Sequence, residues 1–389
     1  MTGPARTATL VALFLAATAL RPQIVGAGPL FPSIEEDLDV PYAVVGLLGT
    51  IPVLCMGIFA PPAAYLAAHV GTRRAMTWSL FLIGVFGVAR AVAPGIWPVV
   101  LLTWGIGIGM GVAGAIAPVA IKERMPDRPA SGTGVYTTGI QVGSTLAAAI
   151  AVPVAGWLGG WRWALAVFSL AALVVGVAWV TLTRHEPRHV AHDERPPKLP
   201  WRSAVAWLLV AIFALMACAY YGLNAWLPDA YVERGWSEES AGALIAALNV
   251  MAIPASFVVP WLSDRVGSRQ TFLTVMSVVF LVAVTGLVVA PDAALAFALL
   301  SGVAQGSMFA LVLTVPLDVE HRPEKVGALV GMMLGLGYTI GALSPFALGA
   351  VRDVTGSYHG ALWAVVGFLA GLVVAVEALG RVRAREATA

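Results

Sequence analysis

Long apolar runs dominate this chain and restrict it to a membrane-spanning helical fold. A helix needs about 20 predominantly apolar residues to cross a bilayer. Only 11% of the 389 residues are charged, whereas a soluble domain carries about 25%. Twelve runs qualify, and they cover residues 8–32, 42–67, 75–94, 97–121, 133–158, 162–183, 203–228, 240–262, 271–290, 293–317, 326–350 and 360–380. We therefore expect an all-α membrane protein with twelve transmembrane helices.

A polar, proline-rich stretch divides the runs into two sets of six. It predicts an N-terminal half over residues 1–183, a cytoplasmic linker over 184–202 and a C-terminal half over 203–389. The halves also repeat, because Leu66-Ala-Ala-His-Val-Gly-Thr-Arg73 aligns with Leu262-Ser-Asp-Arg-Val-Gly-Ser-Arg269, 196 residues later. Two pseudo-symmetric halves of this kind form a central cavity, with the solute site near the middle of the membrane.

Positive charges predict the orientation. Lys and Arg gather in the loops that share a side with the N-terminus, and few lie on the other side. Short cytoplasmic loops carry this excess in membrane proteins. We therefore expect both termini in the cytoplasm, in agreement with an even number of spans, and a multi-pass protein of the inner (plasma) membrane.

Arg21 lies about halfway along the first apolar run. An Arg at that depth costs about +2.5 to +3.5 kcal/mol on insertion scales, and it cannot lose its proton. Such a charge persists where it faces a protein interior or a water-filled cavity. Its planar fork of donors suits a carboxylate, a nitro group or cyanate. Arg21 is therefore predicted to hold an anionic or strongly polar solute.

The repeat carries the Arg21 face into the second half. Ala217 occupies the equivalent position, and Tyr220, Tyr221 and Asn224 share its helical stripe. These three are predicted to bind the solute opposite Arg21, unless the tyrosines only pack between helices. Further candidates for the site are polar or aromatic residues on other helices, for which interhelical hydrogen bonding is the competing explanation: Trp104, Tyr136, Gln141, Asn249, Gln305, Tyr338 and Thr339.

The loop Pro260-Trp-Leu-Ser-Asp-Arg-Val-Gly-Ser-Arg269 resembles the signature loop of the major facilitator superfamily, and the resemblance covers essentially the whole chain. It implies that Asp264 and Arg265 lock the cytoplasmic side against a neighbouring helix end, with Arg269 and Arg73 as further gating candidates. The first-half copy has Ala68 in place of the Asp, so its latch should be weaker. Within the superfamily, Leu20-Arg-Pro22 and Gly28-Pro-Leu-Phe-Pro32 are similar to the cyanate and 2-nitroimidazole transporter family.

Arg90 lies close to the outer end of the third run. Its long side chain is expected to snorkel to the lipid headgroups. A structural pair or a contact at an outer gate is the alternative.

No Asp or Glu falls in the middle of a run, and all six His lie in loops. We therefore expect uniport, exchange, or symport in which the solute itself brings the proton. The leading interpretation is a secondary transporter that moves a small organic or inorganic anion, or a polar nitro or heterocyclic solute, by alternating access. The alternatives are an efflux carrier for neutral aromatic compounds and a non-transporting sensor on the same fold. We expect no enzymatic activity, no cofactor or metal, no nucleic-acid partner, and a monomer in the lipid bilayer.

Overall fold

The structure is a computed structural model that describes residues 3–184 and 198–388. Its regular elements are helices throughout those ranges. Within the described residues, eleven helices are long and apolar enough to cross a membrane, and the total is twelve if one bent pair of helices counts as a single span. The predicted all-α membrane fold is confirmed to this extent. Most of the expected linker 184–202, namely residues 185–197, lies outside the described residues.

The first span is broken near its middle, which the continuous apolar run did not predict. Helix α1 ends at Thr18, and the chain becomes helical again only at Pro22. Proline lacks a backbone N–H, so a helix that continued through Pro22 would lose its hydrogen bond to the Thr18 carbonyl. Ala19 and Leu20 instead bond to carbonyls three residues back, which closes α1. Arg21 therefore lies at the break. The span consists of α1 (Gly3–Thr18), α2 (Pro22–Val25), η1 (Gly28–Leu30) and α3 (Phe31–Leu38).

The second span bends by 56° at Phe59. The segment that follows begins with two prolines, Pro61 and Pro62, in its first turn. Proline is tolerated there because those N–H groups have no intrahelical partner. The span consists of α4 (Tyr42–Val45), α5 (Leu47–Ile58) and α6 (Ala60–Val70).

The other spans begin and end at local sequence signals. Ser203 and Ser237 cap α11 and α12 by accepting from backbone N–H groups, and Gly159 and Gly267 end α9 and α12 in the left-handed conformation. These helices are α7 (Thr72–Val92), α8 (Ile96–Arg124), α9 (Pro129–Leu158), α10 (Trp161–Leu182), α11 (Ala204–Val232), α12 (Glu238–Val266), α13 (Arg269–Val289), η2 (Pro291–Ala293), α14 (Ala294–Val319), α15 (Pro323–Thr355) and α16 (Tyr358–Thr388).

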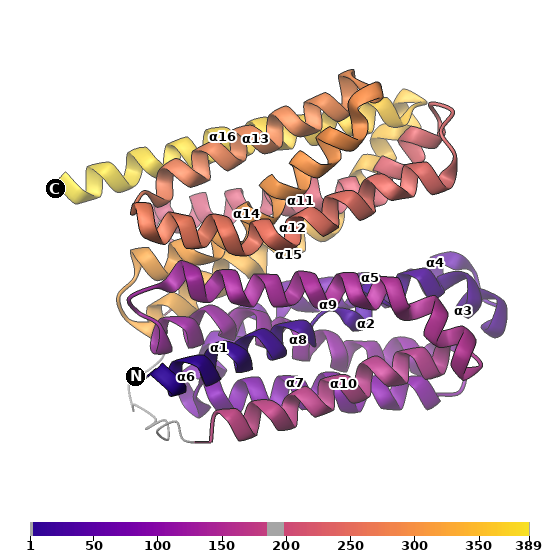
Figure 1. Cartoon of the computed structure of the whole chain (residues 1–389), viewed down its shortest axis with the longest axis horizontal. Coiled ribbons are helices and arrows are strands. Elements are labelled where there is room, and N and C mark those ends of the chain that lie inside the picture. The colour runs from indigo at the N-terminus through magenta and orange to yellow at the C-terminus, as the bar shows by residue number, and fades with distance from the viewer. Residues whose placement is uncertain (1–2, 185–197, 389) are drawn as a thin grey trace.

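Figure 1 shows α1 to α10 gathered in one layer and α11 to α16 in the other. The layers meet where α9 packs on α12 and α14, and where α15 packs on α5, α6 and α8. Small residues allow these approaches, because a Cβ added at Gly134 would lie 3.1 Å from the Ser256 carbonyl oxygen, and one at Gly331 would lie 3.1 Å from the Pro61 Cα. The candidate site lies where the broken first span meets α11, α14 and α15.

Candidate functional site

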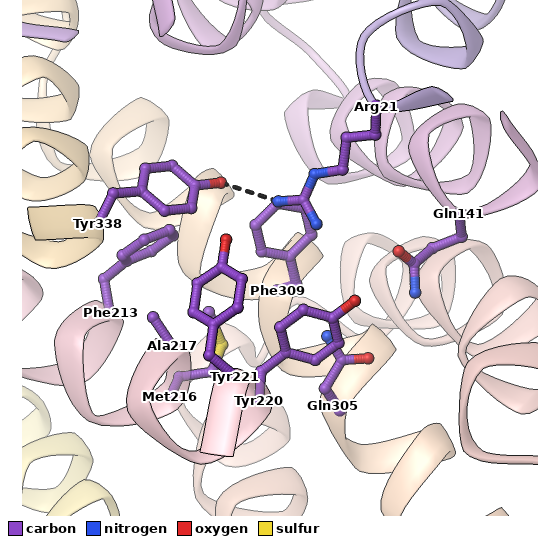
Figure 2. Close-up of a pocket in the computed structure, with 10 residues that line it drawn as sticks. All are labelled: Arg21, Gln141, Phe213, Met216, Ala217, Tyr220, Tyr221, Gln305, Phe309 and Tyr338. Atoms are coloured by element: carbon purple, nitrogen blue, oxygen red, sulfur yellow. Dashed lines mark hydrogen bonds between the residues drawn. The ribbon is translucent and has the colours of Figure 1, made fainter. Parts of the chain in front are cut away.

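Arg21 reaches from the break in the first span toward α14 and α15 (Figure 2). Its Nη2 donates a hydrogen bond to the Tyr338 hydroxyl at 3.2 Å. Its guanidinium carbon lies 5.7 Å from the ring centroid of Phe309, within cation–π range. Arg21 takes part in none of the ion pairs formed by residues 3–184 and 198–388. Both of its direct polar and aromatic partners are therefore neutral.

A cavity lies beside this guanidinium. Aromatic rings form much of its wall: the Phe213 and Tyr338 rings meet edge to face at 4.9 Å, and the Tyr220 and Tyr221 rings do so at 5.3 Å. Such walls suit a flat solute. The lining residues are Arg21, Gln141, Phe213, Met216, Ala217, Tyr220, Tyr221, Gln305, Phe309 and Tyr338 (Figure 2).

A second cavity shares Arg21, Phe309 and Tyr338 with the first. Tyr136 is its other polar side chain. The rest of the lining is apolar or glycine: Leu20, Met56, Met110, Gly114, Ile140, Leu313 and Leu334. The guanidinium thus stands between a chamber rich in hydroxyl and amide groups and a chamber lined mainly by flexible apolar side chains.

Most of the residues predicted for solute binding line these chambers. Six line the first cavity: Arg21, Gln141, Tyr220, Tyr221, Gln305 and Tyr338. Tyr136 lines the second and is 2% exposed. The structure therefore brings together side chains from the first span, α9, α11, α14 and α15.

Four predicted residues lie elsewhere. Asn224 donates to the Tyr220 carbonyl at 2.8 Å and accepts from the Asn249 amide at 3.4 Å, so these two side chains join α11 to α12 and line neither cavity. The Thr339 hydroxyl donates to the Gly335 carbonyl one turn back. Trp104 is 39% exposed on the surface of the bundle.

On the α11 side of the first cavity, the sequence analysis missed two lining residues. Phe213 and Met216 lie on the same α11 stripe as Ala217, Tyr220 and Tyr221, at spacings of three and four residues. Extending the predicted stripe one turn toward the N-terminus would have found both. Their apolar character gave no reason to do so.

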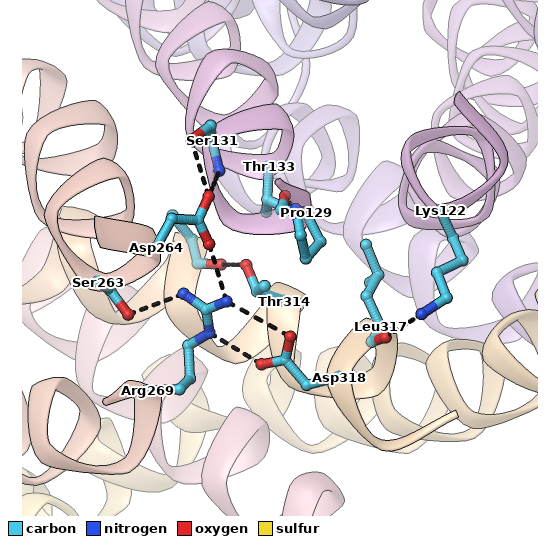
Figure 3. A network of polar contacts seen from close by, with 11 residues as sticks. Lys122, Pro129, Ser131, Thr133, Ser263, Asp264, Arg269, Thr314, Leu317 and Asp318 are labelled. Atoms are coloured by element: carbon cyan, nitrogen blue, oxygen red, sulfur yellow. Dashed lines mark hydrogen bonds and ion pairs between the residues drawn. The ribbon is translucent and has the colours of Figure 1, made fainter. Parts of the chain in front are cut away.

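Asp264 joins the two layers at the end of the molecule where both termini lie (Figures 1 and 3). Its Oδ2 accepts from the backbone N–H of Ser131 at 2.7 Å and from the Ser131 hydroxyl at 2.8 Å. Ser131 is in the first turn of α9, so the carboxylate also meets the positive end of the helix dipole. Arg269 donates to Asp264 at 3.0 Å and to Asp318 at 2.8 Å, and thereby holds the carboxylate in place.

Lys122 makes a second contact between the layers at this end. Its Nζ donates to the Leu317 carbonyl, in the last turn of α14, where backbone carbonyls have no intrahelical partner (Figure 3). A cation here meets the negative end of a helix dipole, as the Asp264 carboxylate meets the positive end of α9.

The other two gating candidates are placed differently from the expectation. Arg265 is exposed, and its guanidinium carbon stacks 3.9 Å from the Trp261 ring centroid, so the hydrogen bonds to Asp264 come from Arg269 and Ser131. Arg73 donates to the Thr183 hydroxyl and to a carbonyl of α10, both in its own layer.

Arg90 is fully buried, which contradicts the expected snorkelling. Its Nη2 donates to the Gln23 side-chain oxygen at 2.7 Å, and its Nη1 donates to the Thr103 hydroxyl at 3.4 Å. Gln23 in turn donates to the Ser169 hydroxyl at 2.9 Å. Gln23 lies on α2, two residues past Arg21, so this network fixes the segment just after the break.

No group of three or more His, Cys, Asp or Glu side chains that could hold a metal ion was found among the described residues. The chemistry of the cavities is therefore that of a guanidinium, hydroxyl groups, amides and aromatic faces. Such groups bind and orient a solute by hydrogen bonds and stacking.

Comparison with known proteins identifies the family. The sequence profile of the Major Facilitator Superfamily matches residues 9–342. The chain belongs to the Major Facilitator Superfamily. Among solved structures of the superfamily, the proton:xylose symporter XylE superimposes with a TM-score of 0.79 at 12% identity, covering 96% of this chain and 95% of that one. At that identity the likeness shows the fold alone.

Two relatives in the superfamily confirm the resemblance seen in the sequence. The cyanate transport protein CynX of Escherichia coli (strain K12) is 30% identical over 355 residues, which cover 90% of this chain and 91% of the relative. The 2-nitroimidazole transporter of the same strain is 27% identical over 388 residues, which cover 99% and 98%.

Proposed function

We propose that this superfamily member moves a small organic or inorganic anion, or a polar nitro or heterocyclic solute, by alternating access. Arg21 binds the negative or electron-rich edge of the solute, with the Tyr338 hydroxyl as a second donor. Tyr220, Tyr221, Gln141 and Gln305 complete the polar contacts. The names of the two relatives, for cyanate and for 2-nitroimidazole, fit solutes of this kind.

The position of Arg21 carries this proposal. It lies near the midpoint of the span Thr7–Leu38, lines both cavities, and has no acidic partner in the described part of the chain. A buried cation without a counter-charge is costly, and a bound anion relieves that cost. Arg21 comes from the first layer and its partners come from the second, so a solute held here touches both.

In the transport cycle we propose, the two halves of the sequence repeat move relative to each other. Residues 1–183 and 203–389 are two six-helix halves, with 184–202 as a cytoplasmic linker and both termini in the cytoplasm of a cell with this protein in its inner membrane. The Asp264 and Lys122 contacts close the cytoplasmic side. Breaking them lets the halves rock about the solute site, as in other carriers built from repeats. The functional unit is a single chain.

Efflux of neutral aromatic compounds is the second candidate. Half of the first cavity's lining residues are aromatic, which favours flat ring systems of either charge. A guanidinium without a carboxylate nearby disfavours the binding of hydrophobic cations. Transport of anions or nitro compounds requires Arg21, whereas efflux of neutral aromatic compounds does not.

Thermal-shift measurements on the purified full chain test the proposal. Small carboxylates, cyanate, nitrate and nitro-heterocycles are screened for stabilisation, because a ligand that binds the folded state raises the melting temperature with its concentration. The screen is repeated with Arg21→Ala and with Arg352→Ala, a matched change at an exposed arginine.

We expect every anionic and nitro hit to lose its effect in Arg21→Ala and to keep it in Arg352→Ala. Hits that persist in Arg21→Ala would move the site elsewhere. Hits restricted to neutral or cationic aromatics would favour efflux of such compounds.

A further inference from the structure

Gln305 on α14 presents an unpartnered carboxamide to the first cavity. The residue is 6% exposed, and its Oε1 has no hydrogen-bond donor among the described residues. In Figure 2 its side chain enters the cavity from the side opposite Arg21. Buried polar side-chain atoms in native proteins nearly always have a partner. An unpaired oxygen that borders a cavity therefore points to a ligand that supplies one.

The two sides of the cavity require opposite hydrogen-bonding groups from a solute. A guanidinium has donors only, so Arg21 fits a carboxylate, a nitro group or another acceptor edge. The Gln305 carboxamide can also donate through Nε2, but its buried unpaired atom is Oε1, an acceptor that fits an N–H or O–H group. The tyrosine hydroxyls between them can donate or accept, and they do not discriminate between solutes in this way.

We propose that Gln305 selects solutes that carry a hydrogen-bond donor on the edge opposite their anionic or nitro group. The substrate class is then a planar aromatic or heteroaromatic acid or nitro compound with a hydroxyl or a ring N–H. Bare inorganic anions such as cyanate have no such donor and leave Oε1 unpaired. This inference rests on the proposed function, in which Arg21 holds the acceptor edge.

The shape of the cavity supports a ring-sized solute. Phe309, Tyr220 and Tyr221 offer flat apolar faces between Arg21 and Gln305, and Phe213 lies to one side, next to Tyr338 (Figure 2). The rings take the body of the solute, and the two polar groups take its opposite edges.

Oε1 is shielded from water and unpaired without solute, so a donor on the solute satisfies it and an analogue without that donor does not. From the cost of an unsatisfied buried acceptor, we expect a donor-bearing solute to bind about 5- to 150-fold more tightly than an analogue without the donor.

Two matched ligand pairs measure this preference on the full chain. One pair is a hydroxybenzoate and its methyl ether, and the other is 2-nitroimidazole and its N-methyl derivative. Dissociation constants are measured for the unmodified protein, for Gln305→Met and for Gln270→Met. Gln270 is the matched control, because its Oε1 is also buried and unpaired but lies near the start of α13, outside both cavities.

We expect the donor-bearing member of each pair to bind at least about fivefold more tightly in the unmodified protein and in Gln270→Met. The preference should disappear in Gln305→Met. Equal binding of both members in the unmodified protein, or an undiminished preference in Gln305→Met, overturns the role of Gln305. If ligand binding is nevertheless lost in Arg21→Ala, the proposed function stands without the role of Gln305. If ligand binding survives in Arg21→Ala, the proposed function and the role of Gln305 are both wrong. The comparison within the unmodified protein requires no variant to fold.

Discussion

Replacing Asp264 by Asn should open the end of the molecule where both termini lie, which the proposed function places in the cytoplasm. The carboxylate accepts two hydrogen bonds from Ser131 and one from Arg269. An Asn has the same size but only one oxygen, and its amide N–H₂ group would face a donor on one side or the other. Asp264→Asn therefore removes at least one charged hydrogen bond and the interaction of the charge with the start of α9.

The size of the effect follows from those contacts. A hydrogen bond to a charged group contributes about 1.5–3 kcal/mol. The Asp264 side chain is 10% exposed, so solvent screens the interaction only in part. If the contacts exist only in the state with a closed cytoplasmic side, the ratio of open to closed protein should rise about 10- to 150-fold.

Distance measurements between spin labels report this ratio. Labels at Asp127→Cys and Thr271→Cys lie in exposed positions on opposite layers, at the same end of the molecule as Asp264. The natural cysteines, Cys55 and Cys218, are both buried and should react slowly with the label. We expect Asp264→Asn to move the distance distribution toward longer distances.

Arg265→Ala is the matched control. Arg265 follows Asp264 directly, is exposed, and stacks on Trp261. We expect its removal to leave the distance distribution unchanged. An unchanged distribution in Asp264→Asn, or an equal shift in Arg265→Ala, would refute the assignment of the latch to Asp264.

Three further predictions concern the site and its support. Arg21→Lys should keep the positive charge but lose bidentate geometry, so ligand stabilisation should fall without vanishing in the thermal-shift screen; full retention would contradict a role for the planar fork. Gln23→Leu leaves the buried Arg90 without its 2.7 Å acceptor and should lower the stability by about 1.5–3 kcal/mol, measured as a lower melting temperature. The double variant Gln23→Leu/Arg90→Met should recover most of that loss, because both partners become apolar; a further fall would show that Arg90 contributes in another way. Trp104→Phe should leave ligand binding unchanged, and a loss of binding would return Trp104 to the site.

The sequence predicted the spans well because length and hydropathy alone determine what can cross a bilayer. It did not predict how two of them are interrupted. The break before Pro22 and the bend at Phe59 depend on prolines within or beside apolar runs, and proline can also be accommodated in a continuous membrane helix. Composition does not distinguish these outcomes, because neighbouring helices decide which backbone groups find partners.

The candidate site shows the same division. Helical periodicity identified the face of α11 that carries Tyr220 and Tyr221, but it could not say where along that face the cavity ends. Asn224 lies one turn further along α11, and its side-chain oxygen accepts a hydrogen bond from Asn249 instead of lining the cavity. Arg90 was expected at the headgroups because it lies close to the outer end of the third apolar run. Its burial depends instead on Gln23, a hydrogen-bond partner 67 residues away in the sequence.

The absence of a carboxylate beside Arg21, within residues 3–184 and 198–388, bears on the energetics of the empty carrier. Without solute the site has a net positive charge, and with a monovalent anion it is neutral. Membrane potential acts on charge at about 2.3 kcal/mol per 100 mV for a full crossing. We therefore expect voltage to bias the return of the empty site and to leave the loaded step almost untouched. Anion on the opposite side of the membrane would load the carrier for its return step, which voltage then affects little. We therefore expect exchange of anion for anion to be faster than net transport.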